Sequence, residues 1–207
     1  MMMRRLVVIS RCICLAAGLL LSSPLSAAAN DDDPYSVNIE QNLATPAVNA
    51  KHSAVVANAM GLLTRTLRQA GFETQGVRKG EVTMVTIPCR DLFGPNSIEI
   101  KAKGKQLLSK LVPYIKRSDK YKVVMAVHAD DTGDAIYAER ITSDRANAID
   151  EYFASALGGE SPVIPYGLGN DEPVAPNTGV ANREKNRRVE IYFVPTKDFI
   201  DNARKKK

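Results

Sequence analysis

The sequence predicts a two-layer α/β fold with a mixed sheet, preceded by an N-terminal helix. Short apolar strands alternate with amphipathic helices from Gly80 to Val194, in the order strand, helix, strand, helix, strand, strand. These about 115 residues are enough to enclose one hydrophobic core. The 207 residues contain no internal repeat and no low-complexity segment, so we expect one domain with extensions.

The N-terminal 29 residues are predicted to be a secretory signal peptide. A basic start precedes a largely apolar stretch from Leu6 to Leu21, and small residues lead up to Ala28 and Ala29, where we expect cleavage. The alternative is a retained membrane anchor. The uninterrupted apolar run, from Cys12 to Leu21, is only about half of the ~20 residues that a transmembrane helix needs. Cleavage is therefore the favoured interpretation.

Charge and cysteine content narrow the class of protein. The whole chain has 28 basic and 23 acidic residues, a formal charge of +5. Cleavage removes Arg4, Arg5 and Arg11 and no acid, which leaves 25 basic residues and a net charge of +2. This balance argues against a nucleic-acid-binding protein.

Of the three cysteines only Cys89 lies outside the leader, so we expect no internal disulfide. We expect Cys89 to be a small, buried hydrophobic residue.

Residues 30–79 are predicted to form a linker and an amphipathic helix. The linker, residues 30–49, is acidic and then polar, without hydrophobic periodicity. The helix is expected at residues 53–70 and ends at Gly71. Its apolar residues recur at spacings of three and four: Val56, Ala59, Met60, Leu63, Leu67 and Ala70. Two roles remain open for this helix, namely covering the domain or docking a partner protein.

The first half of the predicted domain contains a strand, a loop and a helix. Apolar residues at both odd and even positions predict a strand at residues 80–88 that is buried on both faces. A loop follows at residues 90–100, and a helix is expected at residues 103–115. Pro113 lies inside the helical pattern, so we expect a kink or an early end there.

The second half begins with a buried strand at residues 121–129, whose continuous apolar run is typical of a sheet interior. After an acidic turn, Asp134 is expected to cap a helix that runs toward Leu157, with a break near Thr142. Gly158 ends this helix.

The remaining elements are shorter. We expect a strand at residues 163–168, a polar loop at residues 169–184, a last strand at residues 187–194, and a basic tail at residues 196–207. The three lysines at residues 205–207 are expected to be a solvated end.

Asp130 and Arg145 are the candidate ligand-binding residues. Asp130 follows the buried strand, at the end of a sheet where α/β proteins often bind ligands. A straight helix carries Arg145 about 16 Å away from Asp134, whereas a break near Thr142 would bring it back. Side by side, the two groups would bind an ammonium and a carboxylate, as in an amino acid. The alternative is a structural salt bridge between them.

Two motifs relate the chain to a known family. The first comprises His128, Ala129, Asp130, Gly133, Tyr137, Ala138, Ile141, Thr142, Arg145 and Ala146, and the second is Asn-Arg-Arg-Val-Glu-Ile at residues 186–191. Asn96 with Ser97, and Gly167, Gly169 and Pro173 between the motifs, also fit the pattern. With these residues the chain from Val82 to Val194 resembles the OmpA-like domain, the peptidoglycan-binding module of bacterial envelopes.

The resemblance implies a site. In that family the Asp and the Arg that match Asp130 and Arg145 hold the diaminopimelate of the peptidoglycan stem peptide. Asn96, Thr132 and Arg188 match positions that assist binding in some members.

The chain departs from the family pattern at two positions. Ala129 replaces the usual Thr and Ala138 the usual Asn. Each change removes a side-chain hydrogen bond worth about 1 kcal/mol of affinity. Weak binding, or preference for another stem residue such as lysine, therefore stays open.

We therefore predict non-covalent peptidoglycan binding that links cell wall and envelope, without enzymatic activity. The fold implied is an OmpA-like βαβαββ sandwich at residues 80–195, in a periplasmic protein whose association with the outer membrane is left open. No cofactor or nucleic acid is expected. A metal site is not expected either, because His52 is the only histidine besides His128 that could complete a ligand set. The competing hypothesis is an envelope scaffold that keeps the fold but docks another protein through its N-terminal helix and basic tail.

Overall fold

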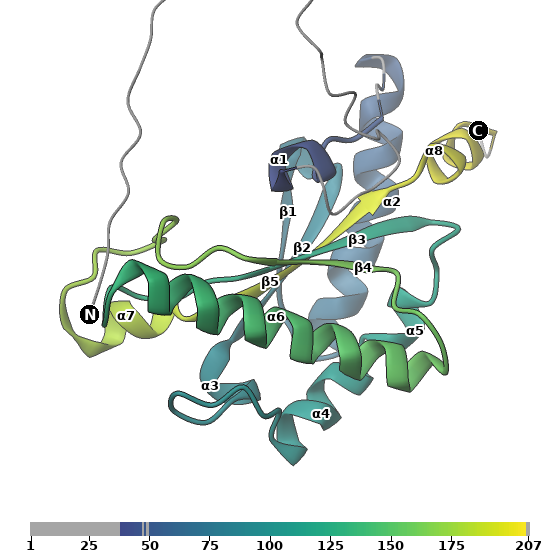
Figure 1. Cartoon of the computed structure of the whole chain (residues 1–207). Helices are drawn as coiled ribbons and strands as arrows, with labels where there is room; N and C mark the ends of the chain where they lie inside the picture. The colour runs from purple at the N-terminus through teal and green to yellow at the C-terminus, as the bar shows by residue number, and fades with distance from the viewer. Residues whose placement is uncertain (1–37, 47, 49, 206–207) are drawn as a thin grey trace, which may run out of the picture. The chain divides into compact units, whose positions relative to one another are not determined.

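Five strands form one mixed sheet in the order β1-β2-β5-β3-β4 (Figure 1). Strands β3 and β4 pair in parallel, and every other neighbouring pair is antiparallel. The predicted α/β class with a mixed sheet is therefore confirmed. The strand bounds are β1 Glu73–Val77, β2 Val82–Pro88, β3 Tyr121–Val127, β4 Val163–Gly167 and β5 Arg188–Pro195.

This computed structural model describes residues 38–46, 48 and 50–205. The signal peptide predicted at residues 1–29 lies outside the described residues, as do residues 30–37 of the predicted linker and the last two lysines. Within the described part of the chain, no helix has the length and apolar character required to cross a membrane.

The helices confirm most of the predicted pattern. The helix expected at residues 53–70 is α2, and the one expected at residues 103–115 is divided into α4 and α5, with Pro113 in the first turn of α5. The predicted early end near this proline is thus confirmed. The helix bounds are α1 Ile39–Asn42, α2 Ala50–Gln69, α3 Cys89–Leu92, α4 Ala102–Ser109, α5 Val112–Ile115, α6 Ala135–Leu157, α7 Gly179–Asn186 and α8 Lys197–Lys205, with a short 3-10 helix at Arg78–Gly80.

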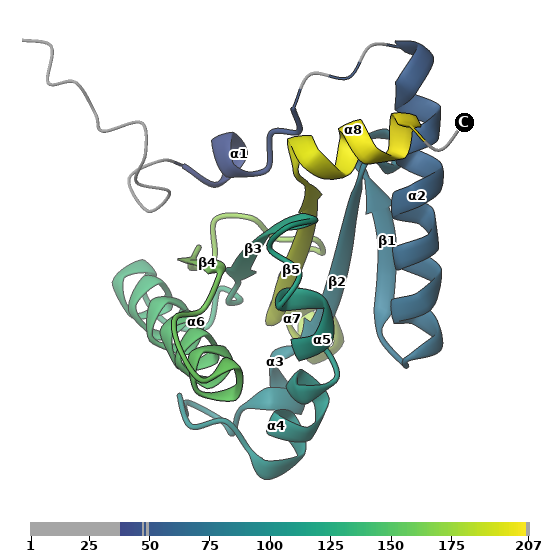
Figure 2. The same ribbon diagram turned by 90° about the vertical axis from the view of Figure 1, so that its right-hand side faces the viewer.

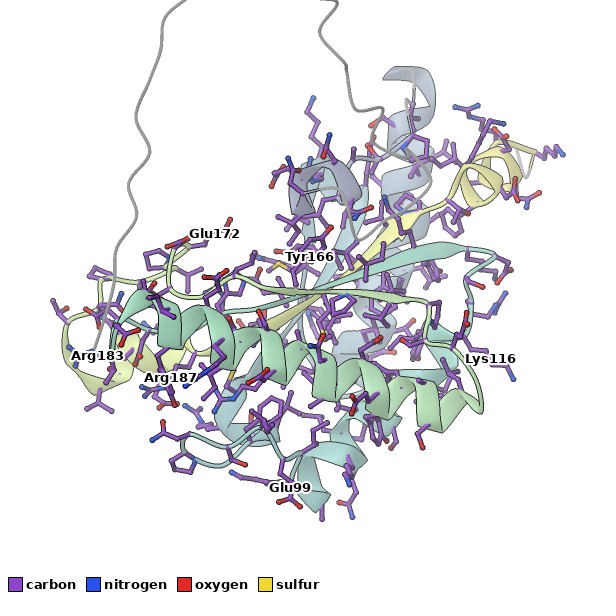
Figure 3. All side chains as sticks on the ribbon, viewed as in Figure 1. Glu99, Lys116, Tyr166, Glu172, Arg183 and Arg187 are labelled. Carbon is purple, nitrogen blue, oxygen red and sulfur yellow. The ribbon has the colours of Figure 1, made fainter. Side chains whose placement is uncertain are left out.

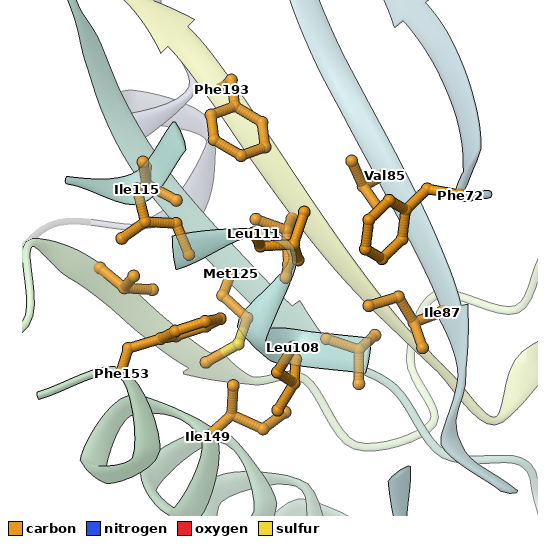
Figure 4. Packing of buried hydrophobic residues seen from close by; sticks show 14 of the residues in the cluster. Phe72, Val85, Ile87, Leu108, Leu111, Ile115, Met125, Ile149, Phe153 and Phe193 are labelled. Carbon is orange, nitrogen blue, oxygen red and sulfur yellow. The ribbon is translucent and has the colours of Figure 1, made fainter. Parts of the chain in front are cut away.

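The main hydrophobic core lies on one face of the sheet. Helices α2, α4, α5 and α6, labelled in Figure 2, all contribute apolar side chains to it, and Figure 4 shows part of this packing from close by. In α2, Val56, Met60 and Leu67 are fully buried, so the apolar face of this helix packs in the core. Of the two roles left open for it, α2 performs the structural one. Large buried side chains of the core include Phe93, Phe153, Phe193, Leu108, Leu111, Ile115, Met125 and Ile149.

A smaller apolar cluster lies on the opposite face of the sheet. Leu43, which follows α1, packs there among Val82, Val124, Ile164 and Val194. The neighbouring Asn42 donates a hydrogen bond from Nδ2 to the Tyr166 hydroxyl at 2.6 Å. Part of the predicted linker is therefore a docked segment that covers the second face of the sheet.

That second face also holds a buried charged cluster on β5. Arg188 Nε donates to Glu190 Oε1 at 2.7 Å, and His128 Nε2 lies 3.3 Å from Glu190 Oε2. The Tyr192 hydroxyl donates to the same carboxylate. Burial alone would raise the pKa of Glu190, but the nearby His128, the Tyr192 hydroxyl and the Arg188 charge lower it to about 2.

Five elements besides the short 3-10 helix were not predicted, namely the four-residue helices α1 and α3, strand β1, and helices α7 and α8. Strand β1 is polar and buries only Thr74, since it lies at the sheet edge and is held by backbone pairing with β2. Helix α7, in the predicted polar loop, buries only Asn186. The tail predicted at residues 196–207 is helical over Lys197–Lys205, where α8 docks with Ile200 buried in the core and Phe199 packed against it.

We predict that truncating Ile200 destabilises the whole domain. Ile200 is 2% exposed, and removing a buried aliphatic side chain usually costs about 2–5 kcal/mol. Urea unfolding of Ile200→Ala should show a loss of this size, while Asn202→Ala, at an exposed position of the same helix, should unfold like the wild type. Equal stability of both variants would show that α8 contributes nothing to the core.

A second prediction concerns stability at acidic pH. Because the pKa of Glu190 falls from 4.5 to about 2 on folding, its stabilising contribution is complete above pH 4.5 and is lost as the pH falls toward 2. The difference in unfolding free energy between wild type and Glu190→Gln should therefore shrink by about 2 kcal/mol between pH 7 and pH 3. A constant difference in urea unfolding at the two pH values would contradict the assignment.

Candidate functional site

A cavity of about 450 Å³ opens where β3 ends and α6 begins. Four backbone segments meet there: the turn after β3, the first half of α6, the segment from α3 to the start of α4, and the junction of α7 with β5. Its walls comprise Cys89, Arg90, Phe93, Gly94, Pro95, Asn96, Lys101, Ala129, Asp130, Thr132, Tyr137, Ala138, Ile141, Arg145, Glu184 and Arg187.

Backbone hydrogen bonds fix the floor of this cavity. Cys89 N donates to Arg187 O and His128 N donates to Arg188 O, both at 2.9 Å. These bonds extend the pairing of β5 with β2 on one side and with β3 on the other, so the ends of the three strands meet at the site.

Asp130 lies in the turn after β3 and is 5% exposed. Its Oδ1 accepts a hydrogen bond from Thr132 N at 3.1 Å, and its Oδ2 pairs with the Arg187 guanidinium. Gly133 has a φ of 104°, which glycine adopts without strain and which lets the chain turn into α6. The predicted cap is confirmed, because Asp134 Oδ1 accepts from Tyr137 N at 2.7 Å.

Arg145 projects from α6 into the same cavity and is 7% exposed. Its Nε donates to Ser97 O at 2.9 Å and its Nη2 to Gly94 O at 3.4 Å. Its guanidinium carbon lies 5.0 Å from the centre of the Phe93 ring. Arg145 therefore holds the loop of residues 94–97 in place and forms one wall of the site.

The predicted break in the helix near Thr142 is wrong. Helix α6 is continuous, and the Thr142 hydroxyl donates to Ala138 O at 2.8 Å within it while accepting from Gly169 N at 3.0 Å. Asp130 and Arg145 nevertheless line one cavity, because the long Arg145 side chain reaches it from an unbroken helix. Among the ion pairs of the described residues, Asp130 is joined to Arg187 rather than to Arg145.

The other predicted site residues divide into two groups. Asn96 and Thr132 both line the cavity, and Asn96 Oδ1 accepts a hydrogen bond from the Tyr137 hydroxyl at 3.3 Å. Arg188 is not among the lining residues, because successive residues of a strand face opposite ways and its side chain joins the Glu190 cluster on the other face. Arg187, whose side chain is labelled in Figure 3, lines the cavity instead.

Glu184, which the sequence analysis missed, links two arginines of the site. Its carboxylate pairs with Arg187 and, at 3.1 Å, with Arg90. Burial opposes ionisation of Glu184, but hydrogen bonds from Arg187 and Arg90 lower its pKa below the usual value. Glu184 lies in α7 and Arg187 directly follows this helix. Their spacing of three residues could have indicated the pair only if a helix had been predicted here.

The thiol of Cys89 lines the cavity in its protonated form. Cys89 is buried, and desolvation raises its pKa to about 11, although nearby arginines oppose the rise. A neutral thiol behaves as a small apolar group, as the sequence predicted.

The fold and the cavity define a two-layer α/β module of the OmpA-like type. A model of the OmpA family matches residues 92–187. Outer-membrane lipoprotein YfiB of Pseudomonas aeruginosa is 30% identical over 125 residues, which cover 60% of this chain and 72% of that protein. Probable lipoprotein YiaD of Escherichia coli is 26% identical over 128 residues, covering 62% of this chain and 58% of that protein. The chain belongs to the OmpA family.

Solved structures share this fold. A putative MotB-like protein from Desulfovibrio vulgaris superposes with a TM-score of 0.60 at 21% identity, over 69% of this chain and 94% of that one. The cell wall anchor of the T6SS from Pseudomonas aeruginosa gives a TM-score of 0.55 at 22% identity, over 65% of this chain and 95% of that one.

We predict that Arg145→Lys loosens the loop of residues 94–97. A lysine keeps the charge but cannot reproduce the planar guanidinium that donates to two carbonyls. Amide hydrogen exchange at residues 93–100 should become faster, while exchange in β3 stays unchanged. Arg140→Lys, at an exposed position of the same helix, should leave both segments unchanged, and equal protection of the loop in all three proteins would contradict this role.

Proposed function

We propose that this protein binds peptidoglycan non-covalently through a diaminopimelate residue of the stem peptide, and so links the cell wall to the envelope. The observation that carries the proposal is one cavity lined by both Asp130 and Arg145. The name of the relative YfiB, an outer-membrane lipoprotein, supports a place in the cell envelope.

The two residues supply complementary chemistry. A carboxylate has acceptor positions for several donors, so Asp130 can accept an ammonium while it keeps its bonds to Thr132 N and Arg187. The Arg145 guanidinium can hold a carboxylate in a bidentate geometry. Asn96, Thr132 and Tyr137 add polar groups around the site. Arg188 no longer belongs to the proposed binding residues, and Arg187 replaces it.

This charge arrangement favours diaminopimelate over lysine as the stem residue. The diaminopimelate side chain ends in a carbon that bears both an ammonium and a carboxylate, whereas lysine ends in an ammonium alone. Lysine would leave Arg145 without an anionic partner in a partly desolvated cavity, which costs affinity. Ala129 and Ala138 both line the cavity, so the two departures from the family pattern lie where they remove ligand contacts of about 1 kcal/mol each.

The competing hypotheses have less support. Docking of another protein through the apolar face of α2 would need that face to be free, but Val56, Met60 and Leu67 are buried in the core. We assign binding rather than catalysis, because the nucleophile at the cavity, Cys89, is buried and has a pKa raised to about 11.

Co-sedimentation with purified peptidoglycan tests the proposal. The wild-type protein should pellet with the insoluble wall, and Asp130→Ala should lose at least ten-fold in affinity, since a charge-assisted bond of about 1.5–3 kcal/mol disappears.

Asp131→Ala is the matched control. Asp131 is the next residue, pairs with Arg183 at 3.0 Å, and is absent from the cavity lining. It should pellet like the wild type. Equal pelleting of Asp130→Ala and wild type, with both proteins folded by circular dichroism, would contradict the proposed site.

A further inference from the structure

The cavity is lined by more positively charged than negatively charged side chains. Four cations line it, namely Arg90, Lys101, Arg145 and Arg187, against two carboxylates, Asp130 and Glu184. Arg187 pairs with both carboxylates, and Arg90 pairs with Glu184. The cavity therefore presents two more positive than negative charges to a ligand.

The two cations left over are Arg145 and Lys101. Within the described residues, neither forms an ion pair with a carboxylate, and both donate to backbone carbonyls instead. Lys101 Nζ donates to Arg90 O at 2.9 Å. A backbone carbonyl carries only a partial charge, so each cation keeps the capacity to bind an anion of the ligand.

The backbone at Lys101 is firmly positioned. Lys101 N donates to Leu92 O at 2.8 Å, and Phe93 pairs with Ile100 in a β-bridge just before it. A Cβ atom added at Gly104 would lie only 3.0 Å from the Leu92 backbone, so the first turn of α4 packs tightly on α3. Lys101 therefore presents its exposed ammonium at a fixed edge of the cavity.

The helix that follows Lys101 adds further positive charge. Lys103 and Lys105 both lie on α4 and are exposed. Exposed cations near a binding site raise the local concentration of anionic ligands.

We propose that Lys101 binds a second carboxylate of the same ligand and so determines which wall peptides are preferred. This inference rests on the proposed function, in which Asp130 takes the ammonium and Arg145 the first carboxylate. The preferred ligand is then a peptide with a net negative charge, in which a residue next to the diaminopimelate carries a free carboxylate. A peptide with that carboxylate converted to an amide binds less tightly.

Two matched synthetic peptides test this inference. Each contains diaminopimelate, and they differ only in a free carboxylate or a primary amide on the neighbouring acidic residue. Calorimetric titration of the wild type should show a five- to ten-fold preference for the carboxylate peptide. Lys101→Met should lose that preference and bind the amide peptide like the wild type. Lys116→Met is the control, since exposed Lys116 lies at the other end of α6 from Arg187 (Figure 3), and it should keep the preference.

The outcomes separate the two proposals. Loss of both peptides in Asp130→Ala, with the preference abolished only in Lys101→Met, supports both. A preference that persists in Lys101→Met, or no preference in the wild type, overturns the role of Lys101 and leaves the diaminopimelate site in place. Binding of neither peptide by the wild type, or unchanged binding by Asp130→Ala, overturns the proposed function and this inference with it.

Discussion

The position of β5 between β2 and β3 is the constraint on which both faces of the sheet depend. Hydrogen bonds from Cys89 N to Arg187 O and from His128 N to Arg188 O join the three strand ends. Because side chains alternate along a strand, the two arginines are directed to opposite faces. Arg187 enters the cavity, while Arg188 neutralises Glu190 in the buried cluster. One motif therefore supplies a residue to the cavity and a residue to the buried cluster.

The cavity contains charged groups that already form ion pairs and a charged group, Arg145, that is bonded only to backbone carbonyls in the described part of the chain. Asp130, Glu184 and the two arginines beside them form a connected ion-pair network that fixes their positions before any ligand arrives. Arg145 fixes a loop through carbonyls and keeps its net charge available. Such preorganisation lowers the entropy lost on binding, and it would offset the polar contacts that Ala129 and Ala138 cannot make in the proposed complex.

Sequence patterns predicted the parts of the fold that bury apolar faces. The runs in β2 and β3 and the faces of α2 and α6 were identified because burial imposes their periodicity. Strand β1 and α7 were missed because backbone pairing and polar contacts hold them, and α8 because only Phe199 and Ile200 join it to the core. Asp130 and Arg145 were placed in one cavity, but by a helix break that does not exist. The choice between Arg187 and Arg188 needed the strand register, which the sequence did not reveal.

The most direct test of the central claim is an NMR titration of the protein with a soluble stem peptide containing diaminopimelate, beside the same peptide with lysine. If one cavity binds ammonium and carboxylate together, the diaminopimelate peptide should shift the backbone amide of Thr132 and the side-chain Nε–H of Arg145, both in the cavity wall. The lysine peptide should shift the Arg145 signal much less. Shifts confined to other surfaces, or none at saturating peptide, would contradict the assignment.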